Sequence, residues 1–128
     1  MGVGIEPFQL GDHREYWGGI PFKVEVATVA ATSSYQVFAG GAPFKCRVLG
    51  MSGVMSGAGA ASDTVQLQDG SSNAITEAVD VSALSDKDKW DVATVDDTYY
   101  DIDAGENLKI VTASGALSLV YVELMRVE

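Results

Sequence analysis

The chain has 128 residues, 47% of them hydrophobic, and its 18 acidic and 8 basic residues give a net charge of −10. This length favours one compact domain that buries roughly two thirds of its unfolded surface. The acidic balance, with no cluster of lysine and arginine, argues against a nucleic-acid partner, because binding to a phosphate backbone requires clustered basic side chains.

Residues 1–19 contain five glycines and one proline, and their large apolar side chains follow neither a helical nor a strand period. They are predicted to form an extended N-terminal arm. We expect this arm to pack on its own domain or on a neighbouring subunit, because a free arm would leave its aromatic side chains in water. We expect Phe8, Tyr16 and Trp17 to be its partner-binding anchors. A first edge strand of the same sandwich is the alternative. The segment lacks the basic and apolar regions of a signal peptide, and no stretch of the chain approaches a membrane span.

Hydrophobic alternation begins at residue 20, where Phe22, Val24 and Val26 share one face and Lys23 and Glu25 the other, which indicates a half-buried strand. Turn residues separate further short segments of this kind. These segments are residues 35–39, 44–49, 64–68, 74–81, 90–95, 99–102, 108–112 and 117–127. About eight strands with almost no helix predict an all-β fold, an antiparallel β-sandwich or jelly roll spanning residues 20–128.

Three segments carry more specific expectations. Residues 50–63, GMSGVMSGAGAASD, are predicted to be a flexible loop, since they lack the lysine and the following helix of a phosphate-binding loop. Residues 82–90, SALSDKDKW, are the one candidate for a helical turn, with Ser82 or Ser85 as its cap. Residues 117–127 are apolar on both faces, which predicts a strand in the centre of a sheet or at an interface.

No set of residues predicts an enzyme. Cys46 is the only cysteine, so no intrachain disulfide can form, and its place between Phe44 and Val48 predicts a small buried hydrophobe. A nucleophilic cysteine needs a histidine base. The only histidine, His13, lies in a polar N-terminal stretch, where a surface role is expected.

Paired carboxylates are the only dense polar feature. Asp101 and Asp103, followed by Gly105, resemble the start of a calcium loop and are the metal candidates, but the remaining ligands and flanking helices of such a loop are missing. A β-turn at residues 103–106 explains these residues more simply. We therefore expect no metal and no other cofactor.

Residues 64–128 resemble the small jelly-roll decoration, or cement, proteins on the heads of tailed bacteriophages. The resemblance rests on the segments TVQLQDG, TVDDTYYDIDAGENLKIVT, ASGA and the closing LVYVELMRVE. It implies a non-enzymatic dimer or trimer that binds the major capsid protein and clamps capsomers on the outer surface of the virion, after assembly in the bacterial cytoplasm. The family has no catalytic motif to carry over.

A second class of function stays open from the residues themselves. Exposed aromatics on one sheet would suit a carbohydrate- or receptor-binding β-sandwich of a phage tail or fibre, although packing in the core or at an interface also explains such residues. The aromatic candidates are Trp17, Trp90, Tyr99, Tyr100 and Tyr121.

Overall fold

The structure is a computed structural model that describes residues 20–28, 33–113 and 118–127. Within these residues it contains nine strands and no helix, which confirms the predicted all-β class. The strands are β1 (Pro21–Ala27), β2 (Ser33–Gln36), β3 (Cys46–Met55), β4 (Thr64–Asp69), β5 (Val79–Asp80), β6 (Lys89–Asp91), β7 (Asp101–Ile102), β8 (Leu108–Ala113) and β9 (Ser118–Arg126).

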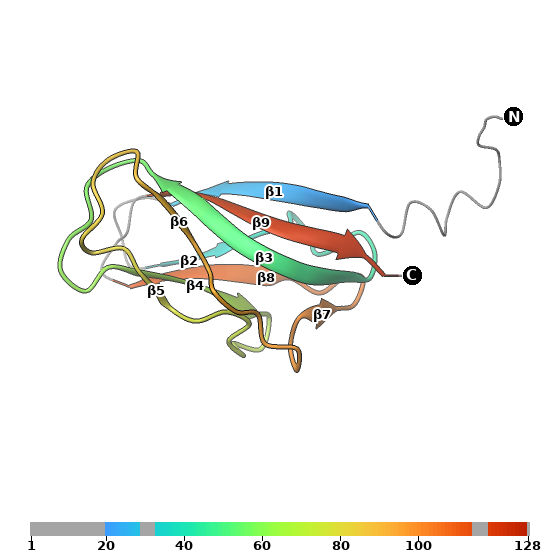
Figure 1. The fold of residues 1–128 in the computed structure, drawn as a ribbon. Coiled ribbons are helices and arrows are strands. Elements are labelled where there is room, and N and C mark those ends of the chain that lie inside the picture. The colour runs from blue at the N-terminus through green and yellow to red at the C-terminus, as the bar shows by residue number, and fades with distance from the viewer. Residues whose placement is uncertain (1–19, 29–32, 114–117, 128) are drawn as a thin grey trace, which may run out of the picture.

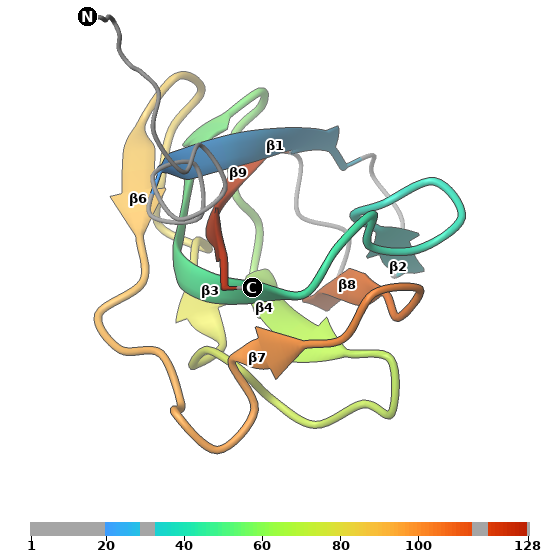
Figure 2. The ribbon, with the colours of Figure 1, turned by 90° about the vertical axis from the view of Figure 1, so that its right-hand side faces the viewer.

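Two antiparallel sheets pack face to face (Figure 1). Sheet A has the order β1-β9-β3-β6, with the short β7 beside β3, and sheet B has the order β2-β8-β4-β5. Four pairings nest inside one another along the chain, namely β1 with β9, β2 with β8, β3 with β6 and β4 with β5. A nested antiparallel ribbon folded over into two sheets is the jelly-roll arrangement, and this confirms the predicted fold (Figure 2).

Every second side chain along the strands points inward, and these side chains fill the space between the two sheets. In β9, Val120, Val122 and Leu124 are fully buried, while Leu119 and Tyr121 lie on the outer face. β9 pairs with β1 on one side and β3 on the other, so it is the central strand that its two apolar faces predicted. The other fully buried large side chains of the core are Val48, Met55, Val65, Leu67, Ile75, Val81, Ile102, Leu108 and Ile110.

The glycine-rich segment differs from its prediction. Residues 50–55 continue β3 rather than forming a loop, and only residues 56–63 connect β3 to β4. Met51, Gly53 and Met55 point inward in alternation, and the ring of Trp90 packs where a side chain on Gly53 would lie. The glycine here therefore makes room for a large core aromatic within a strand.

The expected helical turn at residues 82–90 is wrong. The chain makes two successive turns, in which Leu84 N–H donates to the Val81 carbonyl at 3.2 Å and Asp88 N–H donates to the Ser85 carbonyl at 3.0 Å. The Asp88 carboxylate accepts a hydrogen bond from Ser85 N–H at 2.9 Å, which competes with helical hydrogen bonding. Lys87 N–H and the Asp88 carbonyl are bonded to Met55, so this segment is tied to the end of β3.

Residues 74–81 form less strand than predicted. Only Val79–Asp80 is a strand, and Ala74 and Thr76 make isolated bridges. Glu77, within the predicted strand of residues 74–81, is exposed to solvent, and its carboxylate accepts hydrogen bonds from backbone amides of the chain after β6.

Candidate interaction surface

Three strand ends meet at one end of sheet A. The start of β1 pairs with the end of β9 through Pro21 and Met125, and Met125 also lies opposite Arg47 near the start of β3. Val127 N–H donates to the Lys45 carbonyl at 3.1 Å, which holds the last described residue against the approach to β3. The described chain therefore enters the sandwich at Ile20 and leaves it at Val127 at the same end (Figure 1).

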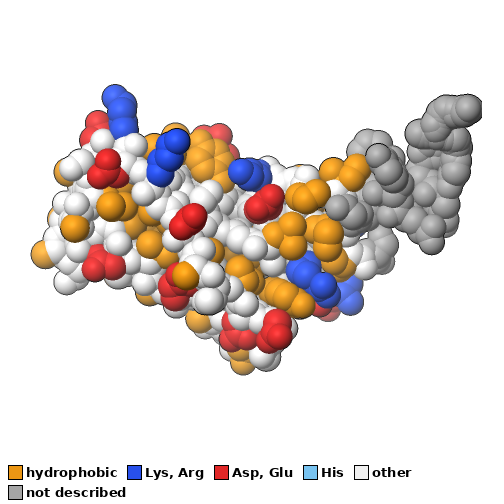
Figure 3. Space-filling view, viewed as in Figure 1, with side chains coloured by type: hydrophobic (Ala, Val, Ile, Leu, Met, Phe, Trp, Pro, Cys, Tyr) orange, Lys and Arg blue, Asp and Glu red, His pale blue; other side chains and the backbone are white. Residues whose placement is uncertain are grey.

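This end of sheet A carries an exposed apolar cluster. Ile20 and Leu49, at 40% and 39% exposure, are the exposed large hydrophobic side chains of the described residues. Leu49 stands at an irregularity in the pairing of β3 with β9, between Val48 and Gly50, and Met125 lies on the outer face of β9 nearby. We call Ile20, Leu49 and Met125 the end patch. Figure 3 shows hydrophobic side chains gathered at this end, beside basic ones.

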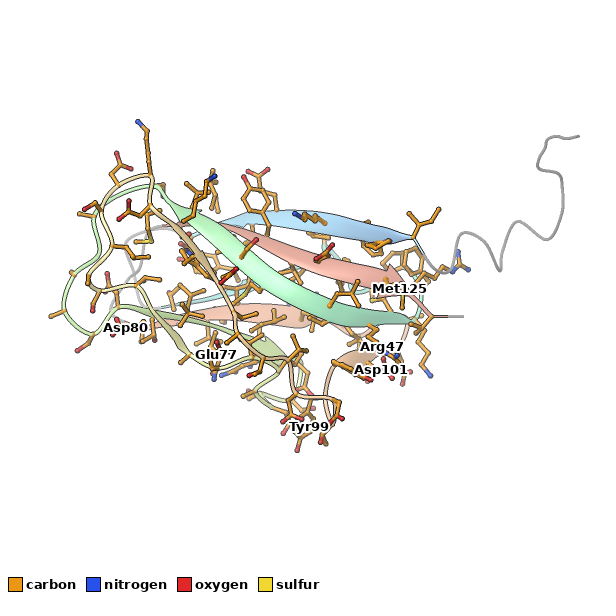
Figure 4. All side chains as sticks on the ribbon, viewed as in Figure 1. Arg47, Glu77, Asp80, Tyr99, Asp101 and Met125 are labelled. Atoms are coloured by element: carbon orange, nitrogen blue, oxygen red, sulfur yellow. The ribbon has the colours of Figure 1, made fainter. Side chains whose placement is uncertain are left out.

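Three of the eight basic residues of this acidic chain, Lys45, Arg47 and Arg126, flank the end patch. Arg47 Nε donates to Asp101 Oδ1 at 2.8 Å and its Nη2 donates to Oδ2 at 3.2 Å. The hydrogen bond from Arg47 is the main cause that lowers the pKa of Asp101. Figure 4 shows Arg47, Asp101 and Met125 together at this end of the sandwich.

Two aromatic rings stack against the guanidinium groups of Arg47 and Arg126. The Arg47 guanidinium lies 4.6 Å from the centre of the Tyr100 ring, and the Arg126 guanidinium lies 4.8 Å from the centre of the Phe44 ring. Such stacking fixes the direction of a planar guanidinium and leaves its edge available for hydrogen bonds. The Nε of Arg126 is buried and lacks an acceptor within the described residues.

The two metal candidates, Asp101 and Asp103, take part in contacts within the fold, Asp101 through its carboxylate and Asp103 through its backbone. Asp101 is engaged by Arg47, and residues 103–106 form a turn in which Glu106 N–H donates to the Asp103 carbonyl at 3.1 Å. The described part of the chain contains no group of three or more histidine, cysteine, aspartate or glutamate residues that could hold a metal ion. It also contains no helix that could cross a membrane.

Cys46 is fully buried, as predicted. Burial, together with the charge of Asp101, raises the pKa of its thiol to about 11. The reactive thiolate is therefore scarce at neutral pH.

The structure leaves the predicted arm anchors untested, because Phe8, Tyr16 and Trp17 lie outside the described residues, as does His13. The end patch was missed by sequence reasoning. Its residues are far apart along the chain, and only the register of β1, β9 and β3 brings them together. The nearest sequence signal is Leu49, an apolar residue placed among the outward-facing residues of the 44–49 strand.

Comparison with known proteins gives a likeness of fold. No protein-family profile and no curated protein matches the sequence. Among solved structures, a chain of the "Cyanophage Pam1 capsid asymmetric unit" is 16% identical with a TM-score of 0.53, and the match covers 97% of this chain and 94% of that one. A chain from "Bacillus endospore appendages form a novel family of disulfide-linked pili" is 14% identical with a TM-score of 0.43, covering 85% and 88% of the two chains.

Proposed function

We propose that this protein is a non-enzymatic phage virion protein that binds the outer surface of the capsid and stabilises the expanded shell by bridging capsomers. The observation that carries the proposal is the fold match to a chain of a phage capsid asymmetric unit over nearly the full length of both chains. The two chains are therefore similar in length as well as in fold. The sequence resemblance of residues 64–128 to phage decoration proteins points in the same direction.

The end patch and its basic flank are the surface that we assign to the major capsid protein. Exposed apolar side chains beside oriented arginines are typical of the anchors at protein interfaces. Ile20 directly follows residues 1–19 in the chain, so the proposed arm and the end patch can engage one partner together. Phe8, Tyr16 and Trp17 are the proposed arm anchors.

Bridging requires more than one contact for each assembly. A dimer or trimer of this chain presents two or three end patches and arms, and linked contacts raise the overall affinity well above that of a single contact. The expanded shell would then be held at junctions between capsomers, on the exterior of the virion, with no role for nucleic acid or membrane.

Co-sedimentation with expanded, undecorated phage heads tests the proposal, with free protein and unexpanded heads as controls. We expect saturable pelleting with expanded heads. Leu49→Asp places a charge in the end patch and should weaken pelleting, whereas Leu119→Asp makes the same change on the outer face of β9, at the opposite end of sheet A. Pelleting that is equally affected by both variants, when circular dichroism shows both folded, would contradict the assigned surface.

The arm is tested separately with a chain that begins at residue 20. If this chain pellets as well as the full-length protein, Phe8, Tyr16 and Trp17 are not anchors. If the full-length protein pellets with no shell, the decoration role is wrong and the carbohydrate- or receptor-binding module of a tail or fibre becomes the better proposal.

A further inference from the structure

A second surface feature lies on the outer face of sheet A, next to the end patch, with which it shares Leu49. It is a hollow of about 390 Å³ between β3, β9 and the chain that follows β6. A neighbouring hollow of about 310 Å³ shares Ser52, Asp91 and Tyr121 with it. Together they offer a site of the size that small molecules occupy, about 300–1,000 Å³.

The backbone explains why this face is hollowed. Gly50 lies on β3 in the hollow, and a Cβ built there would meet no atom within 4 Å. β6 pairs with β3 over only three residues, from Lys89 to Asp91, and residues 92–95 then form a wall of the hollow. The absent side chain and the short β6 leave space that a full-length neighbouring strand would fill.

Unengaged polar groups and one aromatic ring line this space. Tyr121 belongs to both hollows, and in the register of the sheet it lies opposite Ser52. Lys23 and Glu123 lie opposite each other on β1 and β9, and together with Asp91 they line the larger hollow. Within the described residues, the side chains of these five residues make no hydrogen bond or ion pair, so their donors and acceptors are available to a ligand.

This combination fits a neutral sugar better than other ligands. The C–H face of a sugar ring packs on an aromatic ring, whose face carries partial negative charge, and neighbouring hydroxyls donate to carboxylate oxygens. The two carboxylates, Asp91 and Glu123, outnumber Lys23 on the lining and disfavour an anionic ligand, and the polar lining disfavours an apolar one. Within the described residues no group of acidic side chains is dense enough for a metal ion.

We propose that the hollow around Tyr121 is a binding site for neutral sugars. This goes beyond the proposed capsid role and does not depend on it, since the two assays have separate readouts.

An array of neutral hexose and N-acetylhexosamine oligosaccharides, with uronic- and sialic-acid-terminated glycans beside them, tests the proposal on the full-length protein. Titration calorimetry then measures the best neutral glycan and the free hexoses up to millimolar concentrations. We expect binding of neutral sugars, with acidic glycans bound more weakly. Binding of no neutral sugar in either assay, or binding of acidic glycans alone, would overturn the proposal.

Two variants locate the site. Tyr121→Ala removes the ring, and Gly50→Leu fills the hollow from its open backbone position, so each should weaken neutral sugar binding by at least about tenfold. Leu119→Ala, two residues away on the same face of β9 and outside both hollows, should bind as the unmodified protein does. Undiminished binding in both hollow variants would place the sugar elsewhere and contradict the site.

Discussion

At the scale of single residues, the chemistry of Cys46 follows from its burial. Its side chain has no exposed surface, and burial with the nearby Asp101 raises the thiol pKa to about 11. Since the thiolate is the reactive form, we expect the native protein to resist Ellman's reagent at pH 8 and to react fully once guanidinium chloride unfolds it. Rapid labelling of the native protein, followed by absorbance, would contradict the burial.

Two glycines of β3 make a matched pair of tests. A Cβ on Gly53 would collide with the Trp90 ring and the Leu119 carbonyl, whereas a Cβ on Gly50 meets nothing. We expect Gly53→Ala to lower the free energy of unfolding by about 1–3 kcal/mol, and Gly50→Ala to change it by less than about 0.5 kcal/mol. Urea denaturation measures both, and equal effects would show that Trp90 does not occupy the space beside Gly53.

Asp69 links stability to pH. Partial burial works to raise its pKa, but hydrogen bonds from Asn73 and Ser71, with the charge of Lys109, outweigh this and lower the pKa overall. A lowered folded-state pKa means that the stabilisation is present at neutral pH and is lost as the pH falls below about 4 through that pKa.

The variant Asp69→Asn should therefore be less stable than the unmodified protein at pH 7, by about 1 kcal/mol or less, because a carboxylate open to solvent is screened. The difference should shrink as the pH is lowered from about 4. Urea denaturation across this range measures it, and a difference that is independent of pH would refute the role of the charge.

At the scale of elements, Glu77 connects the loop between β4 and β5 to the chain that follows β6. Its carboxylate accepts hydrogen bonds from Ala93 N–H at 2.7 Å and Thr94 N–H at 3.3 Å, and the bond from Ala93 is the main cause of its lowered pKa. In Glu77→Ala these two amides lose their acceptor, so we expect them to exchange with deuterium faster in NMR experiments. The amide of Val122, in the central strand β9, is the control and should be unaffected.

Long strands were predictable from the sequence and short ones were not. Apolar patterning over five or more residues located β1, β4, β8 and β9 to within a few residues: β1, β4 and β8 through alternation, and β9 through its two apolar faces. β5, β6 and β7 contain two or three residues each, too few to show a period. The second half of β3 was hidden by its glycines, and the role of Gly53, which makes room for Trp90, depends on a residue far along the chain.

At the scale of the whole molecule, the jelly roll could be anticipated but its surfaces could not. The number of strands and their turns favoured two sheets, whereas the end patch depends on a three-strand register and on an irregularity that exposes Leu49. The hollow around Tyr121 depends on the position at which β6 stops pairing with β3, and no sequence signal predicts that position. Features created by pairing between distant segments therefore need the structure.

Cryo-electron microscopy of expanded phage heads saturated with this protein would test the capsid role most directly. The account predicts dimers or trimers on the outer surface at junctions between capsomers, with the end of sheet A that holds Ile20, Leu49 and Met125 facing the shell. An outer surface without added density at saturating protein, or density confined to the interior or to the tail, would contradict it.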